Sequence, residues 1–539
     1  MTNSFNSTSV QDKSAGYTLE ELLSIYLFQE LPLSAQEIEQ LDDHLGFSVV
    51  WSDNYEKELT VVDVNGITNG SNENDFLLGA NGDERLKGGK GDDFIWGGEG
   101  NDDLLNVSGK DILIGGSGDD QYVIKNYDSI IVETANNSGK DTAIVYSKGL
   151  DYTIPSNIET LVIEQDSQST RALRKSLFTG SERADIFSSK TDDYIELKGG
   201  KNNDTYIFSS HDNMVITEMA EEGDDWIVAN FKSSADGITE YKIADNVENL
   251  SLKEGSESIA IQGNEENNII IGNTDDNILR GGEGDDDLDG NAGMNTLAGE
   301  TGDDIYRISS SNSDDNVITE MAEEGDDWIV ANFSSSADDI AEYKIAEHVE
   351  NLILKDDSAN INILGNDSDN TIIGNTQDNF LDGGNGNDHM KGESGKDLLK
   401  GGKGNDYLYG GKGHDTMEGG EGNDVFVVNP DDYESGGNYP DIILDFNSEE
   451  DFVQINTSYE PTEHTNRQFL SQGNFISTTT DQLEGKDGLQ SSAEYVFDES
   501  QGILYHNDNG TEPGVENNQN GILALGANAT LIDENIVIN

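Results

Sequence analysis

Residues 88–105 read GGKGDDFIWGGEGNDDLL, which is one nine-residue pattern written twice. Each copy opens with glycines, has an aspartate at its sixth position and ends in apolar residues. Glycine adopts positive φ angles without steric penalty, so the first half of each copy predicts a turn. The second half predicts a short strand around one inward apolar residue. The stretch therefore predicts a chain that turns and extends once per row.

Three blocks of the chain contain this pattern. Nine-residue rows stay in register over residues 70–123, 263–307 and 365–427. Internal repetition on this scale is typical of solenoids. If each row supplies one turn and one strand, two rows complete a coil and the chain stacks on itself every eighteen residues. The expected inward residues of the first block are Ile95, Leu104, Leu113 and Tyr122.

The sixth-position aspartates determine the chemistry of this stack. With two rows to a coil, Asp93 lies over Asp111, and Asp102 lies over Asp120 on the opposite edge. Carboxylates stacked at a strand spacing of about 4.8 Å repel one another unless a cation lies between them. Calcium suits such sites because it accepts carboxylate and backbone carbonyl oxygens in flexible geometry, whereas zinc prefers His and Cys. We therefore expect multiple Ca2+ ions bound along both edges.

The rows match the GGxGxDxUx consensus, so the chain from residue 70 onward resembles the RTX (repeats-in-toxin) hemolysin-type proteins with calcium-binding nonapeptide repeats, which leave the cell by type I secretion. The resemblance implies an all-β fold, a calcium-binding parallel β-roll solenoid, to which we add a short N-terminal helical cap and a C-terminal β-rich domain. The predicted calcium ligands in the rows are Asp75, Asp93, Asp102, Asp111, Asp120, Asp286, Asp304, Asp388, Asp397, Asp406, Asp415 and Asp424, with the backbone of Gly89, Gly91, Gly98, Gly100, Gly384, Gly386, Gly402, Gly404, Gly411 and Gly413.

Some rows depart from the consensus. Asn277 and Asn295 replace the aspartate in the second block, and Glu84 replaces it in the first. An amide adds no charge to attract a cation. We therefore expect one edge of the second block to be weak or metal-free, and the site at Glu84 is in doubt.

Composition narrows the classes of protein and of partner. The 539 residues include 108 Asp+Glu and 30 Lys+Arg, for a formal net charge of -78. Nucleic acid and anionic membranes are therefore poor partners for this chain, and no stretch is long and apolar enough to span a bilayer. Salt adaptation is the alternative explanation, but the periodic placement of the acids favours ligands. Cysteine is absent, so metal is the expected substitute for disulfides in a secreted chain.

The spacers between blocks contain a duplication, since VITEMAEEGDDWIVANF occurs at residues 215–231 and again at 317–333. Such spacers resemble those of large secreted RTX proteins, and we expect them to continue the stack with wider coils. Trp226 and Trp328 are expected to be buried core anchors, with ligand platforms as the alternative. The expected segments are a helical cap at 1–65, the first block at 66–127, spacers with degenerate rows at 128–262, the second block at 263–307, the duplicated spacer at 308–364, the third block at 365–428 and a C-terminal β domain at 429–539.

The two ends differ from the repeats. Residues 17–47 predict two short helices, the second with a capping box of Ser34 and Glu37. We expect these helices to cover an outward apolar patch, with partner binding as the alternative. The residues of this patch are Phe76, Leu78, Phe94, Trp96, Ile112 and Ile114. No basic and apolar secretory signal is expected at the N-terminus.

After the repeats, DIILDFNSEEDF at residues 441–452 resembles the D-x-I-x-D-F element of RTX proteins, which implies Asp441 and Asp445 as further metal ligands. Residues 495–510 resemble a hairpin near the C-terminus of such proteins. By that resemblance, residues 493–539 hold an uncleaved type I export signal, and an exporter is an expected partner.

Motifs of common enzymes are missing from the sequence, which contains no HExxH, GxSxG, P-loop or cysteine nucleophile. RTX enzymes place a catalytic domain before the repeats, and only about seventy residues precede them here. We expect a secreted, extracellular or cell-surface protein with a structural, adhesive or surface-layer role, whose partners are cell-surface polysaccharide or further copies of itself. The alternatives are a secreted enzyme acting on polysaccharide or protein, and a carbohydrate-binding adhesin module with Tyr407 and Tyr409 as an outward aromatic pair.

Overall fold

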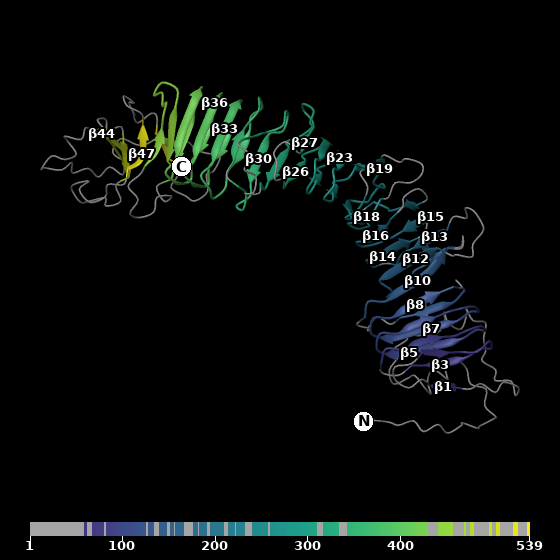
Figure 1. The fold of residues 1–539 in the computed structure, drawn as a ribbon. Coiled ribbons are helices and arrows are strands. Elements are labelled where there is room, and N and C mark those ends of the chain that lie inside the picture. The colour runs from purple at the N-terminus through teal and green to yellow at the C-terminus, as the bar shows by residue number, and fades with distance from the viewer. Residues whose placement is uncertain are drawn as a thin grey trace, which may run out of the picture. The chain divides into compact units, whose positions relative to one another are not determined.

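A computed structural model shows a chain of short β-strands that follow one another in stacked coils (Figure 1). The structure describes residues 59–61, 67–79, 82–125, 128–133, 139–147, 151–155, 157–165, 176–181, 183–190, 194–209, 214–220, 222–231, 240–256, 259–309, 316–333, 342–359, 361–429, 440–455, 468–469, 475–478, 495–498, 503–506, 521–525 and 536–538. Within these ranges there is no helix, and so none that could cross a membrane. The helices expected at 17–47, and with them the helical cap, lie outside the described residues. The expected parallel β-solenoid is confirmed.

Residues 1–234 form one compact unit. Its strands make three parallel sheets, in which odd and even strands occupy different sheets. The first contains β1 (Leu59–Val61), β3 (Phe76–Leu78), β5 (Phe94–Glu99), β7 (Ile112–Ser117) and β9 (Ile130–Val132). The second contains β2 (Ile67–Asn69), β4 (Arg85–Lys87), β6 (Asp103–Leu105), β8 (Gln121–Ile124), β10 (Thr142–Ser147), β12 (Thr160–Gln165), β14 (Ile186–Lys190), β16 (Thr205–Phe208) and β18 (Trp226–Ala229). The third contains β11 (Tyr152–Thr153), β13 (Ser176–Thr179), β15 (Ile195–Lys198) and β17 (Met214–Ile216).

Residues 235–539 form the second unit, which has the same construction. One sheet runs through β20 (Asn249–Leu252), β22 (Ile269–Ile271), β24 (Asp287–Asp289), β26 (Ile305–Ile308), β28 (Trp328–Ala331), β30 (Asn351–Leu354), β32 (Thr371–Ile373), β34 (His389–Lys391), β37 (Tyr407–Tyr409), β40 (Val425–Val428) and β42 (Phe452–Ile455). The alternate strands are β19 (Glu240–Lys242), β21 (Ala260–Gln262), β23 (Ile278–Glu283), β25 (Thr296–Thr301) and β27 (Val317–Ile318), then β29 (Glu342–Lys344), β31 (Asn362–Leu364), β33 (Phe380–Asn385), β36 (Leu398–Lys403), β39 (Thr416–Glu421) and β41 (Asp441–Ile443). A short ladder joins β35 (Ser394–Gly395) to β38 (Lys412–Gly413).

The C-terminal strands extend these sheets. They are β43 (Gln468–Phe469), β44 (Phe475–Thr478), β45 (Tyr495–Asp498), β46 (Ile503–His506), β47 (Gly521–Leu525) and β48 (Ile536–Ile538). Strand β47 pairs with β41, and β48 pairs with β42. Strands β45 and β46 pair antiparallel, which is the hairpin expected there. The last coil of the solenoid is thereby continued by strands from the end of the chain.

Inward apolar residues form columns through each unit. In the first block, Leu77 pairs with Ile95 and Ile95 with Leu113, each eighteen residues apart. The inward positions expected at Ile95, Leu104, Leu113 and Tyr122 are confirmed, since all four side chains are fully buried. Burying one such side chain contributes roughly 1.5–3 kcal/mol. The stack is therefore held by one large apolar residue per row.

The spacers continue the coils but with more residues in each. The backbone of Asp204 bonds to a residue 21 positions later, and that of Asp304 to one 23 positions later, so the expected wider coils are confirmed. The expectation that Trp226 and Trp328 are buried anchors is wrong. Strand alternation turns Ile227 and Ile329 inward instead, and leaves both indoles half-buried on the outer face.

Candidate metal centres

The glycine-rich half of each row forms the turn that positions the carboxylates. All ten glycines predicted as ligands adopt positive φ angles, including 127° at Gly404. A Cβ at Gly404 would also overlap the carbonyl oxygen of Gly386 in the preceding coil. Glycine is therefore required twice at this position, for backbone conformation and for close stacking.

The sixth-position aspartates stack as the sequence predicts. The Asp93 amide donates to Oδ1 of Asp111 at 2.8 Å, and the Asp102 amide donates to Oδ1 of Asp120 at 2.8 Å. Each carboxylate thus receives a backbone hydrogen bond from the aspartate one coil earlier. These bonds hold the side chains in the turn. Oδ1 of each aspartate accepts the hydrogen bond, and Oδ2 lies close to the first glycine of the same row.

The second carboxylate oxygen has no protein donor in most of these rows. Among the described residues, buried Oδ2 atoms without a hydrogen-bond partner occur at Asp102, Asp120, Asp204, Asp286, Asp304, Asp388, Asp397, Asp406 and Asp424. A buried, unpaired carboxylate oxygen is strongly unfavourable unless it binds a cation or a proton. The donors here are all oxygens, which suits calcium. The residues present therefore fit the metal that their pattern implies.

Burial changes the acidity of these carboxyls. It raises the pKa of Asp286 to about 8, with neighbouring Asp304 adding to the shift. It raises the pKa of Asp397 to about 8 in the same way, with Asp415 adding to it. Without a cation, such groups hold protons near neutral pH. A proton and a cation therefore compete for the same oxygens.

Two predicted ligands differ from the others. Oδ2 of Asp75 accepts hydrogen bonds from the amide and the hydroxyl of Ser71. Oδ2 of Asp111 accepts a hydrogen bond from the side-chain amide of Asn106. Protein donors therefore occupy the oxygen that other rows leave available. Their role as metal ligands stays a prediction, and it is weaker than for the other aspartates.

In the rows with asparagine, the sixth-position side chain finds its hydrogen-bond partners within the protein. Oδ1 of Asn268 accepts from the Asn264 amide at 2.8 Å, and its Nδ2 donates to the Glu248 carbonyl at 3.0 Å. Asn277 makes the same kind of contacts, since its Oδ1 accepts from the Asn273 amide at 2.8 Å. The side-chain NH2 group supplies donors within the turn that an aspartate lacks. The metal-free edge expected at Asn277 stays a prediction. Its physical reason is that the asparagine side chain already has hydrogen-bond partners and carries no charge.

Glu84 takes the place of an aspartate in the first block. Its amide donates to Oδ1 of Asp102 at 2.7 Å, and its side chain is buried beside Gly79. The longer side chain therefore still reaches the turn of its own row.

The D-x-I-x-D-F element places both of its aspartates on the last rows of the third block. Oδ1 of Asp441 accepts from the Asp415 amide at 2.9 Å. The two oxygens of Asp445 accept from the amides of Gly419 and Gly420 at 2.9 and 2.8 Å. The structure therefore brings these residues to the turns, and their binding of metal stays a prediction.

The sequence did not predict Asp204 as a candidate metal ligand. Asp204 is fully buried with an unpartnered Oδ2, and burial raises its pKa to about 8. It lies in GGKNNDTYI at residues 199–207, which retains the two opening glycines and the sixth-position aspartate. This spacing could have identified Asp204 as a ligand, but the row has Asn202 instead of glycine at its fourth position and so departs from the consensus.

The proposed aromatic pair of the adhesin alternative is not exposed. Tyr409 is buried, and the Tyr407 hydroxyl accepts a hydrogen bond of 2.9 Å from Gln454 on β42. The Tyr407 ring also packs edge-on against His389. These tyrosines serve packing between strands rather than forming an open platform.

Comparison with known proteins identifies the repeats. A family model described as RTX calcium-binding nonapeptide repeat (4 copies) matches residues 69–105, 107–122, 262–297, 364–399 and 391–426. These matches fall on the three blocks read from the sequence. No curated protein matches the chain.

Proposed function

We propose that this chain, which contains RTX calcium-binding nonapeptide repeats, is a secreted protein that folds on calcium outside the cell and has a structural, adhesive or surface-layer role. The observation that carries this proposal is the series of buried aspartate oxygens without a hydrogen-bond partner, stacked along both edges of the coils. Buried carboxylates in such number require positive charge.

The stacked aspartates explain why the chain would fold outside the cell and not inside it. In a cell interior with scarce calcium, the stacked aspartates repel one another and keep the chain extended for export. Bound calcium supplies the positive charge between carboxylates, at the roughly 10⁻⁴ to 10⁻³ M range of extracellular modules. The glycine turns then close and the inward apolar columns pack. Because a preformed site is absent from the extended chain, ligand binding and folding share one free energy.

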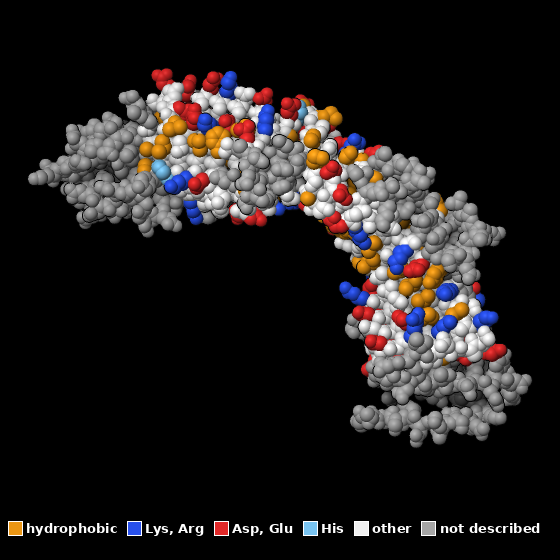
Figure 2. Space-filling model, viewed as in Figure 1, with side chains coloured by type: hydrophobic (Ala, Val, Ile, Leu, Met, Phe, Trp, Pro, Cys, Tyr) orange, Lys and Arg blue, Asp and Glu red, His pale blue; other side chains and the backbone are white. Residues whose placement is uncertain are grey.

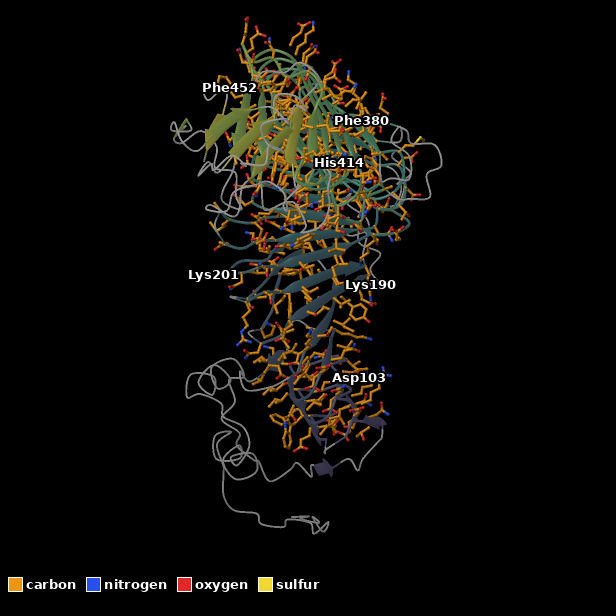
Figure 3. All side chains as sticks on the ribbon, turned by 90° about the vertical axis from the view of Figure 1, so that its left-hand side faces the viewer. Asp103, Lys190, Lys201, Phe380, His414 and Phe452 are labelled. Atoms are coloured by element: carbon orange, nitrogen blue, oxygen red, sulfur yellow. The ribbon has the colours of Figure 1, made fainter. Side chains whose placement is uncertain are left out.

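The surface supports a role in contact with solvent. Acidic and basic side chains are scattered over the described surface in Figure 2, and hydrophobic side chains gather in patches between them. Exposed side chains such as Lys190 and Lys201 project from the coils (Figure 3). Cell-surface polysaccharide and further copies of the chain are the proposed partners, and a type I exporter acting on residues 493–539 is the proposed route out.

Circular dichroism of the full-length chain during calcium titration tests the proposal, with magnesium as the ion control. We expect a cooperative transition from coil to β structure between micromolar and millimolar calcium, and none with magnesium. Asp397→Asn should weaken the transition, whereas Asp275→Asn, at an exposed position in an asparagine row, should leave it unchanged. A chain that is already folded in excess chelator would overturn the proposal.

A further inference from the structure

The last row before a spacer is built differently from the rows inside a block. Inside a block, the amide of the first glycine donates to a backbone carbonyl one coil ahead, as from Gly88 to Leu105 at 3.1 Å. In the rows at 115–123, 199–207 and 299–307, a glutamate from the following spacer accepts instead. The bonds run from Gly115 to Glu133 at 3.3 Å, from Gly199 to Glu218 at 2.9 Å and from Gly299 to Glu320 at 3.1 Å.

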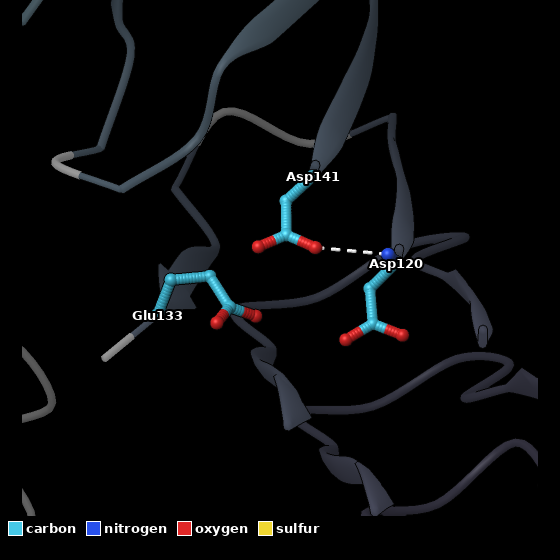
Figure 4. A group of neighbouring side chains, drawn as sticks. All are labelled: Asp120, Glu133 and Asp141. Atoms are coloured by element: carbon cyan, nitrogen blue, oxygen red, sulfur yellow. Dashed lines mark hydrogen bonds between the residues drawn. The ribbon is translucent and has the colours of Figure 1, made fainter. Parts of the chain in front are cut away.

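Each of these glutamates meets two stacked aspartates. Asp120, Glu133 and Asp141 are 1%, 5% and 2% exposed. Each offers a carboxylate oxygen, and the three oxygens lie within 4.8 Å of one another, as the converging side chains in Figure 4 show. Oδ1 of Asp141 accepts from the Asp120 amide at 2.8 Å, which holds the two aspartates in register.

The hydrogen bonds of this cluster recur after two further rows, although only the cluster of Asp120, Glu133 and Asp141 brings three carboxylate oxygens within 4.8 Å of one another among the described residues. Oδ1 of Asp225 accepts from the Asp204 amide at 2.7 Å, and Glu218 bonds to Gly199 beside them. Oδ1 of Asp327 likewise accepts from the Asp304 amide at 2.9 Å. All of these carboxylates are buried. Three spacers of different length thus place a glutamate at the same point of the coil.

Unpartnered oxygens are directed into these clusters. Oδ2 of Asp120, Asp204 and Asp304 is buried without a hydrogen-bond partner, and so is Oε2 of Glu320. At Gly199, a Cβ would overlap both Oδ2 of Asp204 and Oε1 of Glu218. The aspartate and glutamate oxygens therefore lie beside the same glycine, at a point that a side chain would block.

We propose that Glu133, Glu218 and Glu320 each complete a calcium site with the stacked aspartates beside them. These sites lie in the last nonapeptide row of each stretch, where the next coil comes from a spacer. The inference rests on the proposed function, because it needs a chain that binds calcium. Three carboxylates give each site more negative charge than a pair of row aspartates, so these sites fill at lower calcium concentrations than the others.

The buried charge makes a cation or a proton necessary here. Burial raises the pKa of Glu320 to about 8, and the nearby charges of Asp327 and Asp304 add to the shift. Burial likewise raises the pKa of Glu218 to about 7, with Asp225 adding to it. A cation in each cluster would return these groups to the ionised state.

A competing explanation gives the glutamates a hydrogen-bonding role alone. Glu133 and Glu218 accept from the hydroxyls of Tyr122 and Tyr206 as well as from the glycine amides. Glutamine keeps an acceptor oxygen for these donors but removes the charge. Glutamate-to-glutamine variants therefore separate the two roles.

Calcium binding to the full-length chain provides the test, by equilibrium dialysis with a count of bound ions. We expect Glu320→Gln to bind one ion fewer per chain, or to weaken the tightest class of sites by about tenfold or more. Glu323→Gln, at an exposed position in the same spacer, should leave number and affinity unchanged. An unaltered count and affinity in Glu320→Gln would overturn the inference, whereas a wild-type chain that binds no calcium would overturn the proposed function itself.

Terbium luminescence excited through tyrosine gives an independent readout that does not depend on the folding of a glutamate variant. Tyr122, Tyr206 and Tyr306 have their hydroxyls beside the first glycine of the three rows. If terbium fills the proposed sites first, luminescence at low terbium should fall strongly in the triple tyrosine-to-phenylalanine variant. Unchanged luminescence would contradict the proposed placement of the first ions.

Discussion

Residues 365–382 and residues 383–427 belong to one block of stacked coils, but the hydrogen-bonding groups of their turns find partners in different ways. In the former, Oδ1 of Asn379 accepts from the Asn375 amide at 2.8 Å, and its Nδ2 donates back to Oδ1 of Asn375 at 3.1 Å. In the latter, Oδ2 of Asp406 is buried without any partner. One atom per row, an amide nitrogen or a carboxylate oxygen, therefore decides whether a turn needs a cation.

The two kinds of row are not distributed at random within the blocks that begin with asparagine. Two asparagine rows, which read GNxxxN, open the second block and two open the third. Only aspartate rows follow in the third block, whereas in the second block the Asn295 row lies between two aspartate rows. A turn with internal donors forms without an ion and presents a strand edge on which the next row can pair. We therefore expect the asparagine rows that open these blocks to act as a template for the aspartate rows.

Substitution of a stacking glycine should have the largest effect. Gly404→Ala introduces a side chain at a φ of 127° and an overlap with the Gly386 carbonyl. We expect the free energy of unfolding in calcium to fall by more than about 3 kcal/mol, since the backbone penalty alone is 1–2 kcal/mol. Denaturant unfolding followed by circular dichroism measures it.

Gly255 is the matched control for this variant. It has a φ of 78°, but a Cβ there would meet nothing within 4 Å. Gly255→Ala should lose only about 1–2 kcal/mol. Equal losses in the two variants would show that the backbone angle matters and the stacking contact does not.

Conversion of an asparagine row should produce a smaller, calcium-dependent effect. Asn379→Asp removes the donor to Asn375 and leaves a buried carboxylate, so we expect a loss of about 1–3 kcal/mol at the lowest calcium concentration that folds the unaltered chain. Higher calcium should restore part of this loss. Thermal unfolding at low and at high calcium measures both values.

Asn405→Asp is the control, because Asn405 is exposed and its Oδ1 accepts from the Asn423 amide, a bond that aspartate retains. It should show no such calcium dependence. If Asn379→Asp behaves like Asn405→Asp, the self-satisfied turn is not what separates the two kinds of row.

The pH dependence of the calcium-free chain should show the smallest effect. The carboxyl pKa of Asp286 and of Asp397 is raised from 3.8 to about 8 by burial. The stability contributed by their bound protons is therefore present at low pH and is lost as the pH rises through about 8. Calcium-free chain should have more β structure at about pH 5 than at about pH 8. The opposite trend in circular dichroism would contradict the assignment of buried carboxyls to the aspartate rows.

The sequence by itself determined the coil. Two rows of nine residues return the chain to the same point, so Ile95, Leu113 and the stacked aspartates followed from period alone. The positive φ of Gly404 and the fit of the carboxylates to calcium followed from residue type. These features repeat at constant spacing, and a local pattern is enough to place them.

The tertiary structure decided those contacts that join residues at irregular spacing in the sequence. Glu133, Glu218 and Glu320 arrive from spacers of unequal length, so no fixed interval links them to the aspartates that they meet. Ser71 donates hydrogen bonds to Oδ2 of Asp75, which rows without such a donor leave available. Trp226 lies on the outer face of its strand, because Ile227 is the residue that packs between the sheets. A repeat determines where each turn lies, and the contacts between coils determine which oxygens remain for an ion.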